Sequence, residues 1–303
     1  MSGNPITSTN VAQAIVKLVA AEALPALVGN LVMGNLVNRN YEPVIANAGD
    51  TVNIPIAPVL TANNIAEGGS VALQNPSLGN AQIVLNTHVE ASFQIPDVTK
   101  VLAVPDLLKT YLRPAVIAIA EKIETDLCSL YAQLTANAAV GTGGSALIEG
   151  TIDSAETTLF KAKVPSAVQK YLVVYPDAYS QLRQIARFSE YQKIGDAGIS
   201  SLIQGTVGKI KDFLVFRSQF VQQTGSTTTH NFAFAKDAFG LVIRRLPQPI
   251  PGTGAIAEYA EMGNFGMRVI LSYQPGTLAQ QFTVDCLYGC AVLRNGFAVE
   301  IDS

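Results

Sequence analysis

The sequence predicts an α+β fold with one dominant helix and many short strands. Residues 106–136 place apolar side chains three and four positions apart, which is the spacing of one helix face. Residues 52–56 and 83–95 instead alternate apolar and polar side chains, which is typical of strands with one buried face. From residue 171 onward, short apolar runs separated by turn residues predict further strands.

Composition indicates a protein with part of its surface covered by something other than water. The chain has 303 residues, enough for one large domain or two ordinary ones. Only 14% of its residues are charged and 49% are hydrophobic, whereas soluble domains average about 25% charged residues. A membrane and a subunit interface are the two candidate covers, since obligate interfaces are more apolar than ordinary surface.

The most apolar stretch, residues 11–37, does not fit a membrane span. Lys17, Glu22 and Pro25 interrupt it, and a spanning helix needs about 20 predominantly apolar residues with few charges. No Lys or Arg precedes the stretch, so the positive start of a signal peptide is missing as well. We therefore expect a cytoplasmically made protein without a membrane partner, and we attribute its low charge to contacts between subunits.

The first 99 residues are predicted to form two segments that extend from the body of the protein. Residues 1–48 form an arm with an expected helix before Pro25 and a second short helix ending near Asn38, and this arm must pack on the body or on another subunit. Residues 49–99 predict a long two-stranded excursion with a polar, Gly-rich tip between its strands. An isolated hairpin is marginal in water, so such an excursion usually lies on something else.

The dominant helix is expected over residues 106–136, with Pro114 bending it or marking a second start. The remaining residues predict a helix at 154–162, a strand at 171–175 and a helix that Asp177 caps. Further strands are expected at 213–216 and 232–243, then after a Pro-rich loop at 267–273, 281–288 and 290–301.

Charge and cysteine content argue against two function classes. The net charge is −3, and the longest basic run is Arg244–Arg245, whereas a protein that grips nucleic acid needs a concentrated positive face. Cys128, Cys286 and Cys290 are an odd number in a long chain, which fits a reducing compartment rather than a disulfide framework.

Two glycine motifs fail as nucleotide sites. Gly208–Lys209 invites comparison with a phosphate-binding loop, but Ile203 stands where that motif has its first Gly and Ile210 where it has a hydroxyl. The run from Gly252 to Ala257 matches a loose dinucleotide fingerprint, yet it follows a Pro-rich segment that cannot be the required buried strand. We expect surface loops at both places.

The remaining chemical groups predict no catalytic, cofactor-binding or metal-binding residues. His88 lies on the polar face of the expected return strand, and His230 follows a Ser/Thr-rich segment taken as a loop, without a nucleophile elbow to make a triad. Cys286 and Cys290 lack the further ligands of a zinc site and are expected to be small hydrophobes. Carboxylate pairs complete the set and are expected on solvated faces or in intersubunit ion pairs: Glu121 with Glu124, and Glu258 with Glu261.

The order of these parts resembles the major capsid proteins of tailed double-stranded-DNA bacteriophages, whose fold is named after phage Hong Kong 97. No single motif establishes the resemblance. It rests on a set of motifs that follow one another in the family's order over about residues 10–301. Its members are Gly49–Pro55 at the entry to the family's E-loop, Tyr111–Leu127 in its spine helix, Leu172–Tyr179, Ile203–Val215 (with Asp212 where Gly is common), Phe232–Phe239 and Gly263–Arg268.

The resemblance implies five regions. They are an N-terminal arm (1–48), an E-loop hairpin (49–99), a P-domain with the spine helix (100–165), an A-domain (166–260) and return strands of both domains (261–303). It also implies a structural, non-enzymatic subunit that assembles as pentamers and hexamers into an icosahedral shell around double-stranded DNA, without cofactors and without specific DNA binding. The expected location is the virion, after assembly in the bacterial cytoplasm.

Partners beyond the chain itself follow from the same resemblance. A separate scaffolding protein, a portal and cement proteins are expected. Some family members crosslink an E-loop Lys to a neighbouring Asn, but no Lys or Arg lies between Arg39 and Lys100 here, so non-covalent contacts are expected. An encapsulin-type nanocompartment shell, a tail-tube or other virion component, and an enzyme with an unrecognised site remain as alternatives.

Overall fold

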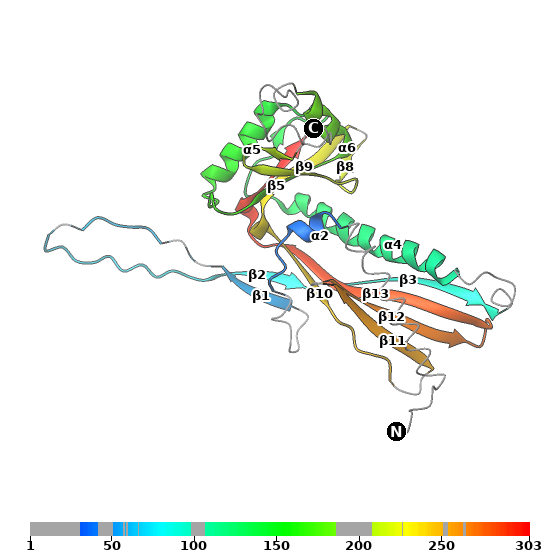
Figure 1. The fold of residues 1–303 in the computed structure, drawn as a ribbon. Coiled ribbons are helices and arrows are strands. Elements are labelled where there is room, and N and C mark those ends of the chain that lie inside the picture. The colour runs from blue at the N-terminus through cyan, green and yellow to red at the C-terminus, as the bar shows by residue number, and fades with distance from the viewer. Residues whose placement is uncertain are drawn as a thin grey trace, which may run out of the picture.

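A computed structural model describes residues 31–41, 51–56, 58, 60–65, 67–97, 107–185, 208–225, 227–250, 254–262 and 265–303. These residues form a body with two β-sheets and a long helix, and a narrow hairpin that stands away from the body (Figure 1). The expected α+β class is confirmed. The helix expected before Pro25 lies outside the described residues.

The first sheet is built around one long strand, β13 (Ala279–Val292). β13 pairs antiparallel with β3 (Thr87–Pro96), β12 (Phe265–Gln274) and β10 (Phe239–Arg244), and β12 pairs with β11 (Ala255–Met262). Phe93 and Phe282 lie directly opposite each other across β3 and β13, and their rings stack at 5.4 Å. Such a cross-strand aromatic pair helps to fix the register of the sheet.

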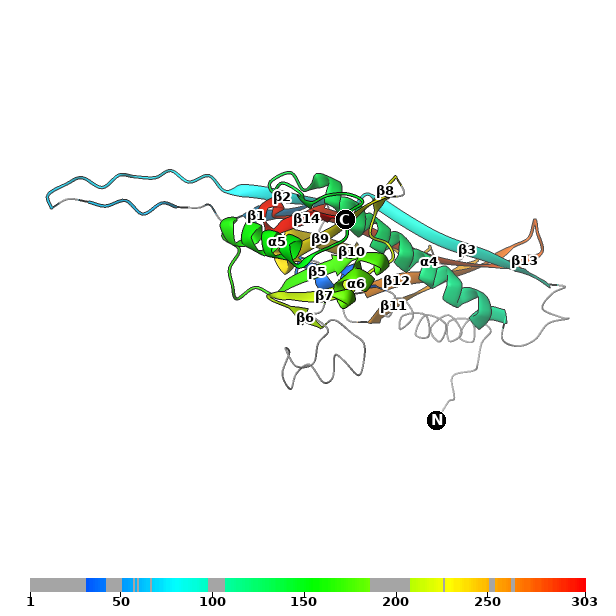
Figure 2. The same ribbon diagram turned by 90° about the horizontal axis from the view of Figure 1, so that it is seen from above.

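The long helix α4 (Leu107–Ser129) lies along this sheet and ends in a short 3₁₀ turn, η2 (Leu130–Gln133) (Figure 2). Its apolar stripe is buried in the main core, and the helix runs without a break through Pro114. The expected second start is therefore wrong. The buried members of the stripe are Leu112, Val116, Ile119, Ile123, Leu127, Leu130 and Leu134.

The second sheet has the strand order β4-β14-β9-β5-β7-β6, with β8 paired to β9. Helices α5 (Glu149–Lys161) and α6 (Pro176–Gln184) bury Ile152, Leu159 and Leu182 in the core of this sheet. Its strands are β4 (Val140–Gly141), β5 (Lys170–Val174), β6 (Lys209–Ile210), β7 (Phe213–Arg217), β8 (Gln223–Thr224), β9 (Thr228–Ala235) and β14 (Ala298–Asp302).

The strand expected over 232–243 is two strands in different sheets. β9 ends at Ala235, a 3₁₀ turn (η3, Lys236–Ala238) follows, and β10 then enters the first sheet. On the return path a 3₁₀ turn (η4, Asn295–Phe297) stands between β13 and β14. The chain thus crosses between the sheets at two neighbouring 3₁₀ turns, which contact each other.

Sheet membership gives region limits that differ from the expected ones. Helix α5 falls within the range 100–165 assigned to the P-domain, yet it packs with the second sheet. Strands β10 and β11 fall within the range 166–260 assigned to the A-domain, yet they belong to the first sheet. We therefore propose an A-type unit made of the described residues within 140–238 and 295–303, with the P-type unit formed by the first sheet and α4.

Part of the arm is anchored on the chain's own body. Helix α2 (Met33–Leu36) buries Met33 and Leu36 in the main core, and Asn38 forms a bridge with Gly240 of β10. The described part of the arm therefore needs no second subunit for its packing. No helix among the described residues combines the length and apolarity needed to cross a membrane.

Candidate functional site

The feature that stands apart from the body is a hairpin of residues 51–84, called here the tongue. Its base is the two-stranded sheet of β1 (Thr51–Ile56) and β2 (Gly79–Val84), which among the described strands pair only with each other. Beyond them the chain continues as an extended loop far from the body (Figures 1 and 2). The structure has the expected two-stranded excursion with an irregular tip, but its return strand ends at Val84. Residues 87–96, expected in the same return strand, form β3 of the first sheet instead.

The tongue carries apolar side chains in a position where its own chain does not bury them. Glu67 is the only charged residue in its sequence. Leu73 is 94% exposed and Val71 is 72% exposed, and Leu60, Ile65 and Leu78 are exposed too. The gathering of five exposed apolar side chains on one projecting segment makes the tongue a candidate site of contact with another molecule.

The base of the tongue is fastened to β10 and β13 by close contact. Val52, Ile54 and Ile83 form a small core with Val242 and Leu293. Glycine permits this approach, because a Cβ on Gly289 would lie 2.3 Å from the Val84 carbonyl oxygen. The tongue is therefore held firmly at its base and is free at its tip.

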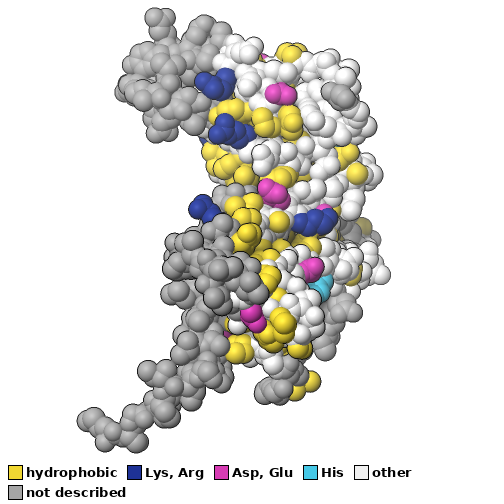
Figure 3. All heavy atoms as spheres, turned by 90° about the vertical axis from the view of Figure 1, so that its right-hand side faces the viewer, with side chains coloured by type: hydrophobic (Ala, Val, Ile, Leu, Met, Phe, Trp, Pro, Cys, Tyr) yellow, Lys and Arg dark blue, Asp and Glu magenta, His cyan; other side chains and the backbone are white. Residues whose placement is uncertain are grey.

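The opposite end of the body also exposes apolar side chains. Tyr111 at the start of α4, and Tyr273 and Leu278 around the β12–β13 turn, are about half exposed or more. Figure 3 shows a band of hydrophobic side chains on this side of the molecule, with Lys, Arg, Asp and Glu side chains interspersed along it. Apolar surface is thus presented at both ends of the chain.

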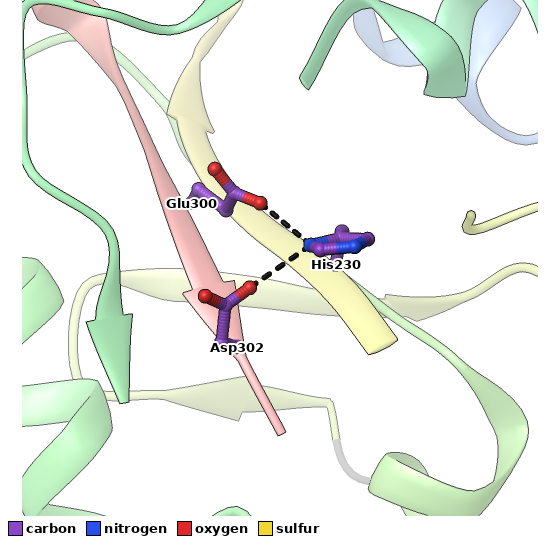
Figure 4. A group of neighbouring side chains, drawn as sticks. All are labelled: His230, Glu300 and Asp302. Carbon is purple, nitrogen blue, oxygen red and sulfur yellow. Dashed lines mark hydrogen bonds and ion pairs between the residues drawn. The ribbon is translucent and has the colours of Figure 1, made fainter. Parts of the chain in front are cut away.

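His230 was expected to follow a loop and to lie at a surface or an interface. It lies inside β9 with its side chain 11% exposed, and it faces two carboxylates of β14. Its Nδ1 lies 2.7 Å from Glu300 Oε1 and 3.0 Å from Asp302 Oδ1 (Figure 4). Burial, followed by the neighbouring Asp302 carboxylate, raises the pKa of Glu300 above its usual range. The spacing of Glu300 and Asp302, two residues apart on one strand face, was the available sequence signal for this cluster.

His88 lies on the solvent side of β3, as expected, and contacts Asp285 of β13 at 3.1 Å. Arg268 of β12 already binds both oxygens of that carboxylate. The Asp285 carboxylate is therefore neutralised by a fork-shaped ion pair, and this histidine is not brought to a nucleophile.

The cysteines are free thiols in or beside the main core. Burial raises the pKa of Cys290 to about 11 and also raises the pKa of Cys128. Because a thiolate is the form that attacks substrates or binds metals, these groups are poorly suited to either role near neutral pH. This placement agrees with the expectation of small hydrophobes.

Glu124 was expected on a solvated face, and that expectation is wrong. Its side chain is fully buried, and its two carboxylate oxygens accept hydrogen bonds at 3.0 Å from the backbone amides of Met33 and Gly34. Burial nevertheless raises the pKa of Glu124, since desolvation outweighs these bonds. Its neighbour Glu121 is exposed, as expected.

The other sequence candidates form no described cluster. Gly208 and Lys209 lie at the edge strand β6, while Gly205 is outside the described residues. Residues 252 and 253 are outside them as well, and Glu258 and Glu261 lie on the edge strand β11. An open polar hollow of about 170 Å³ is lined by Asp177, Gln181 and Thr229, among other residues, and includes none of the sequence candidates.

Neither a protein-family model nor a curated protein matches this sequence. Solved structures do match over most of the chain. A structure of Mycobacterium phage Che8 has a TM-score of 0.66 at 21% identity and covers 89% of this chain and 90% of that chain. The capsid of Ralstonia phage GP4 has a TM-score of 0.62 at 14% identity, with 88% and 87% covered.

A further match is weaker. The holo-SrpI encapsulin complex from Synechococcus elongatus has a TM-score of 0.50 at 13% identity, covering 84% of this chain and 81% of that chain. The phage structures therefore superpose better, over equal or greater lengths. This chain has the fold of tailed-phage capsid proteins, the Hong Kong 97-like fold that its sequence resembles.

Proposed function

We propose that this chain is the major capsid protein of a tailed bacteriophage and assembles as pentamers and hexamers into the icosahedral head that encloses the double-stranded DNA genome. The observation that carries the proposal is the tongue, whose exposed Leu73 and Val71 find no burial on their own body. The proposed role of the chain is mechanical rather than catalytic. The shared fold supports the proposal.

The geometry favours contacts between unlike surfaces of neighbouring copies. The tongue projects from one end of the body, and Tyr273 and Leu278 are exposed near the other end. When one patch contacts a different patch on the next copy, the copies form closed rings if the rotation between them closes. Rings of five and six would then be joined by tongues that lie across adjacent subunits.

We propose that further partners are a separate scaffolding protein, a portal and cement proteins. The proposal of these partners rests only on the resemblance of the sequence to tailed-phage major capsid proteins. The enclosed DNA would be held without specific binding, which agrees with a net charge of −3. We propose assembly in the bacterial cytoplasm and residence in the virion.

The encapsulin match gives the second candidate, a protein nanocompartment. The two functions differ in what the particle contains. Purified particles with phage-genome DNA inside would support the capsid, whereas particles with a packaged protein and no nucleic acid would support the nanocompartment.

Negative-stain microscopy and sedimentation of the purified chain test the assembly. The chain, with a candidate scaffolding protein from the same gene neighbourhood if needed, is expected to give closed shells. Leu73→Asp is expected to abolish shells while the subunit stays folded, because it places a charge where apolar surface would be buried. Ile148→Asp is the matched control, since Ile148 is 59% exposed on the body, and it should still give shells.

Two results would contradict the proposal. One is a stable monomer at high concentration with the tongue protected from protease. The other is full assembly of the Leu73→Asp variant.

A further inference from the structure

The cluster of His230, Glu300 and Asp302 lies outside the apolar contacts on which the proposed shell function rests. β9 and β14 pair antiparallel with His230 directly opposite Asp302, and Glu300 stands two residues earlier on the same face. The three side chains therefore converge from two strands of one sheet, as Figure 4 shows. Such cross-strand and diagonal neighbours lie within reach of one another.

The charges in this cluster are unbalanced. Two carboxylates face one ring nitrogen, and no Lys or Arg among the described residues forms an ion pair with either of them. The side chains of His230, Glu300 and Asp302 are only 11%, 16% and 22% exposed. One N–H can be directed at one oxygen, so a neutral imidazole leaves a carboxylate poorly compensated in a partly buried place.

The second ring nitrogen is held in the manner of a metal ligand. His230 Nε2 lies 2.8 Å from the hydroxyl oxygen of Thr224, and the ring stacks on Tyr131 with centroids 4.3 Å apart. When Nε2–H donates to that hydroxyl, the lone pair of Nδ1 points at the carboxylates. Metal-binding histidines are oriented by such a hydrogen bond from their other nitrogen.

We propose that Nδ1 of His230, Oε1 of Glu300 and Oδ1 of Asp302 bind a divalent transition-metal cation. These three atoms all lie within 4.8 Å of one another. Neighbouring ligands of an octahedral ion with bonds of about 2.1 Å stand about 3.0 Å apart, close to the two observed N–O distances. Water would fill the open positions.

The ligand set selects the class of ion. One imidazole with two carboxylates suits Zn²⁺ or Mn²⁺, whereas Mg²⁺ and Ca²⁺ prefer oxygen ligands throughout. Affinity is expected to be higher for Zn²⁺ than for Mn²⁺.

The place of the site in the fold suggests what the ion does. Tyr131 belongs to η2 at the end of α4 and packs on the main core, whereas His230 belongs to the second sheet. The ion would hold the ring that Tyr131 covers, and so fix the joint between α4 and the second sheet. Metal binding should therefore raise the melting temperature of the chain.

The test uses the full-length chain, stripped with a chelator and then dialysed against Zn²⁺ or Mn²⁺. Bound metal is measured by mass spectrometry, and one ion per chain is expected. His230→Gln and the double variant Glu300→Gln/Asp302→Asn should each lose at least tenfold in affinity, and Thr224→Val should lose about tenfold because it frees the ring. His88→Gln is the matched control and should bind as the wild type does, since Arg268 already occupies the Asp285 carboxylate.

The absorption spectrum of bound Co²⁺ distinguishes binding at this site from binding at the cysteines. It needs no variant, so the proposal stays testable if a variant fails to fold. The wild-type chain with Co²⁺ is expected to show an absorption spectrum of nitrogen and oxygen ligands. A sulfur-to-cobalt charge-transfer band, no saturable binding, or unchanged binding in folded His230→Gln would each overturn the proposal. The measurement does not depend on assembly, so failure of the shell function would leave it intact.

Discussion

The carboxylate of Glu124, fully buried in α4, accepts a hydrogen bond from the backbone amide of Met33 at 3.0 Å. A second bond of the same length comes from Gly34. Amides at the start of a helix have no partner within that helix, and here a side chain of α4 supplies one. A segment 90 residues earlier in the chain is thereby fixed to the long helix.

Removing this carboxylate should destabilise the body. Glu124→Ala leaves two buried amides without acceptors, each costing about 1–3 kcal/mol in the free energy of unfolding. Glu121→Ala lies one turn earlier on an exposed face of the same helix and should change stability by less than about 0.5 kcal/mol. Urea unfolding of both variants measures the difference, and equal stabilities would show that the amides find water instead.

The same group gives a defined pH dependence. The folded protein raises the pKa of Glu124 above the ordinary 4.5, so the folded state binds its proton more tightly than the unfolded state does. The stability from this proton is complete below 4.5 and is lost as the pH rises through the raised pKa. Glu124→Gln does not titrate, so its stability deficit relative to wild type should shrink as the pH rises, as unfolding at several pH values would reveal. A deficit that grows with pH would mean that the hydrogen bonds, not burial, dominate.

A second, partly buried hydrogen bond ties α4 to β13. The hydroxyl of Tyr288, which is fully buried, donates to Asp126 at 2.7 Å. Tyr288→Phe should lower the free energy of unfolding by about 1.5–3 kcal/mol, as for a hydrogen bond to a charged group. Tyr273→Phe removes a similar hydrogen bond to Asp97 on the surface and should change the free energy of unfolding little. Thermal unfolding of both variants measures the difference.

The packing of the tongue base on β13 can be tested at one glycine. Gly289→Ala would place a Cβ 2.3 Å from the carbonyl oxygen of Val84, so the backbone of β2 must move away. We expect faster proteolysis of the tongue base and impaired assembly. Gly276→Ala, in the turn before β13 where a Cβ meets nothing within 4 Å, should behave as the wild type does. Unchanged protection in Gly289→Ala would show that the tongue is not seated on β13.

Covalent linkage between subunits is not expected from the tongue. It contains no Lys, so it cannot supply the amine of an isopeptide bond. Purified particles boiled in detergent should therefore run as a single band at the 32.0 kDa of one chain. A ladder of larger species that contains peptides from residues 51–84 would contradict this.

The sequence predicted the faces of strands better than their partners. The alternation from Ile83 to Ile95 indicated one face, and that face is confirmed, yet the run divides at Leu85–Asn86 into two strands. β2 pairs with β1, whereas β3 pairs with β13, about 190 residues later in the chain. The period of two is the same on both sides of the division, so nothing in the pattern marks a change of partner.

The partners of the buried polar residues were beyond the reach of pattern reasoning, although the spacing of Glu300 and Asp302 placed these two on one strand face. Glu124 lies off the apolar stripe of α4 and resembles any solvated glutamate until α2 covers it. His230 was expected to be a surface or interface histidine because a Ser/Thr-rich segment precedes it, and only the pairing of β9 with β14 sets it against Asp302. Contacts between such distant segments depend on topology, which local spacing does not encode.

The tongue carries a single charged residue, Glu67, and this has a consequence for how particles respond to ionic strength. Contacts between surface charges weaken as salt shortens the screening length, to about 3 Å at 1 M. A contact made by Leu73, Val71 and their apolar neighbours has almost no such component, and salts such as sulfate strengthen burial of this kind. Particles joined by these tongues should therefore survive both dilute buffer and concentrated brine.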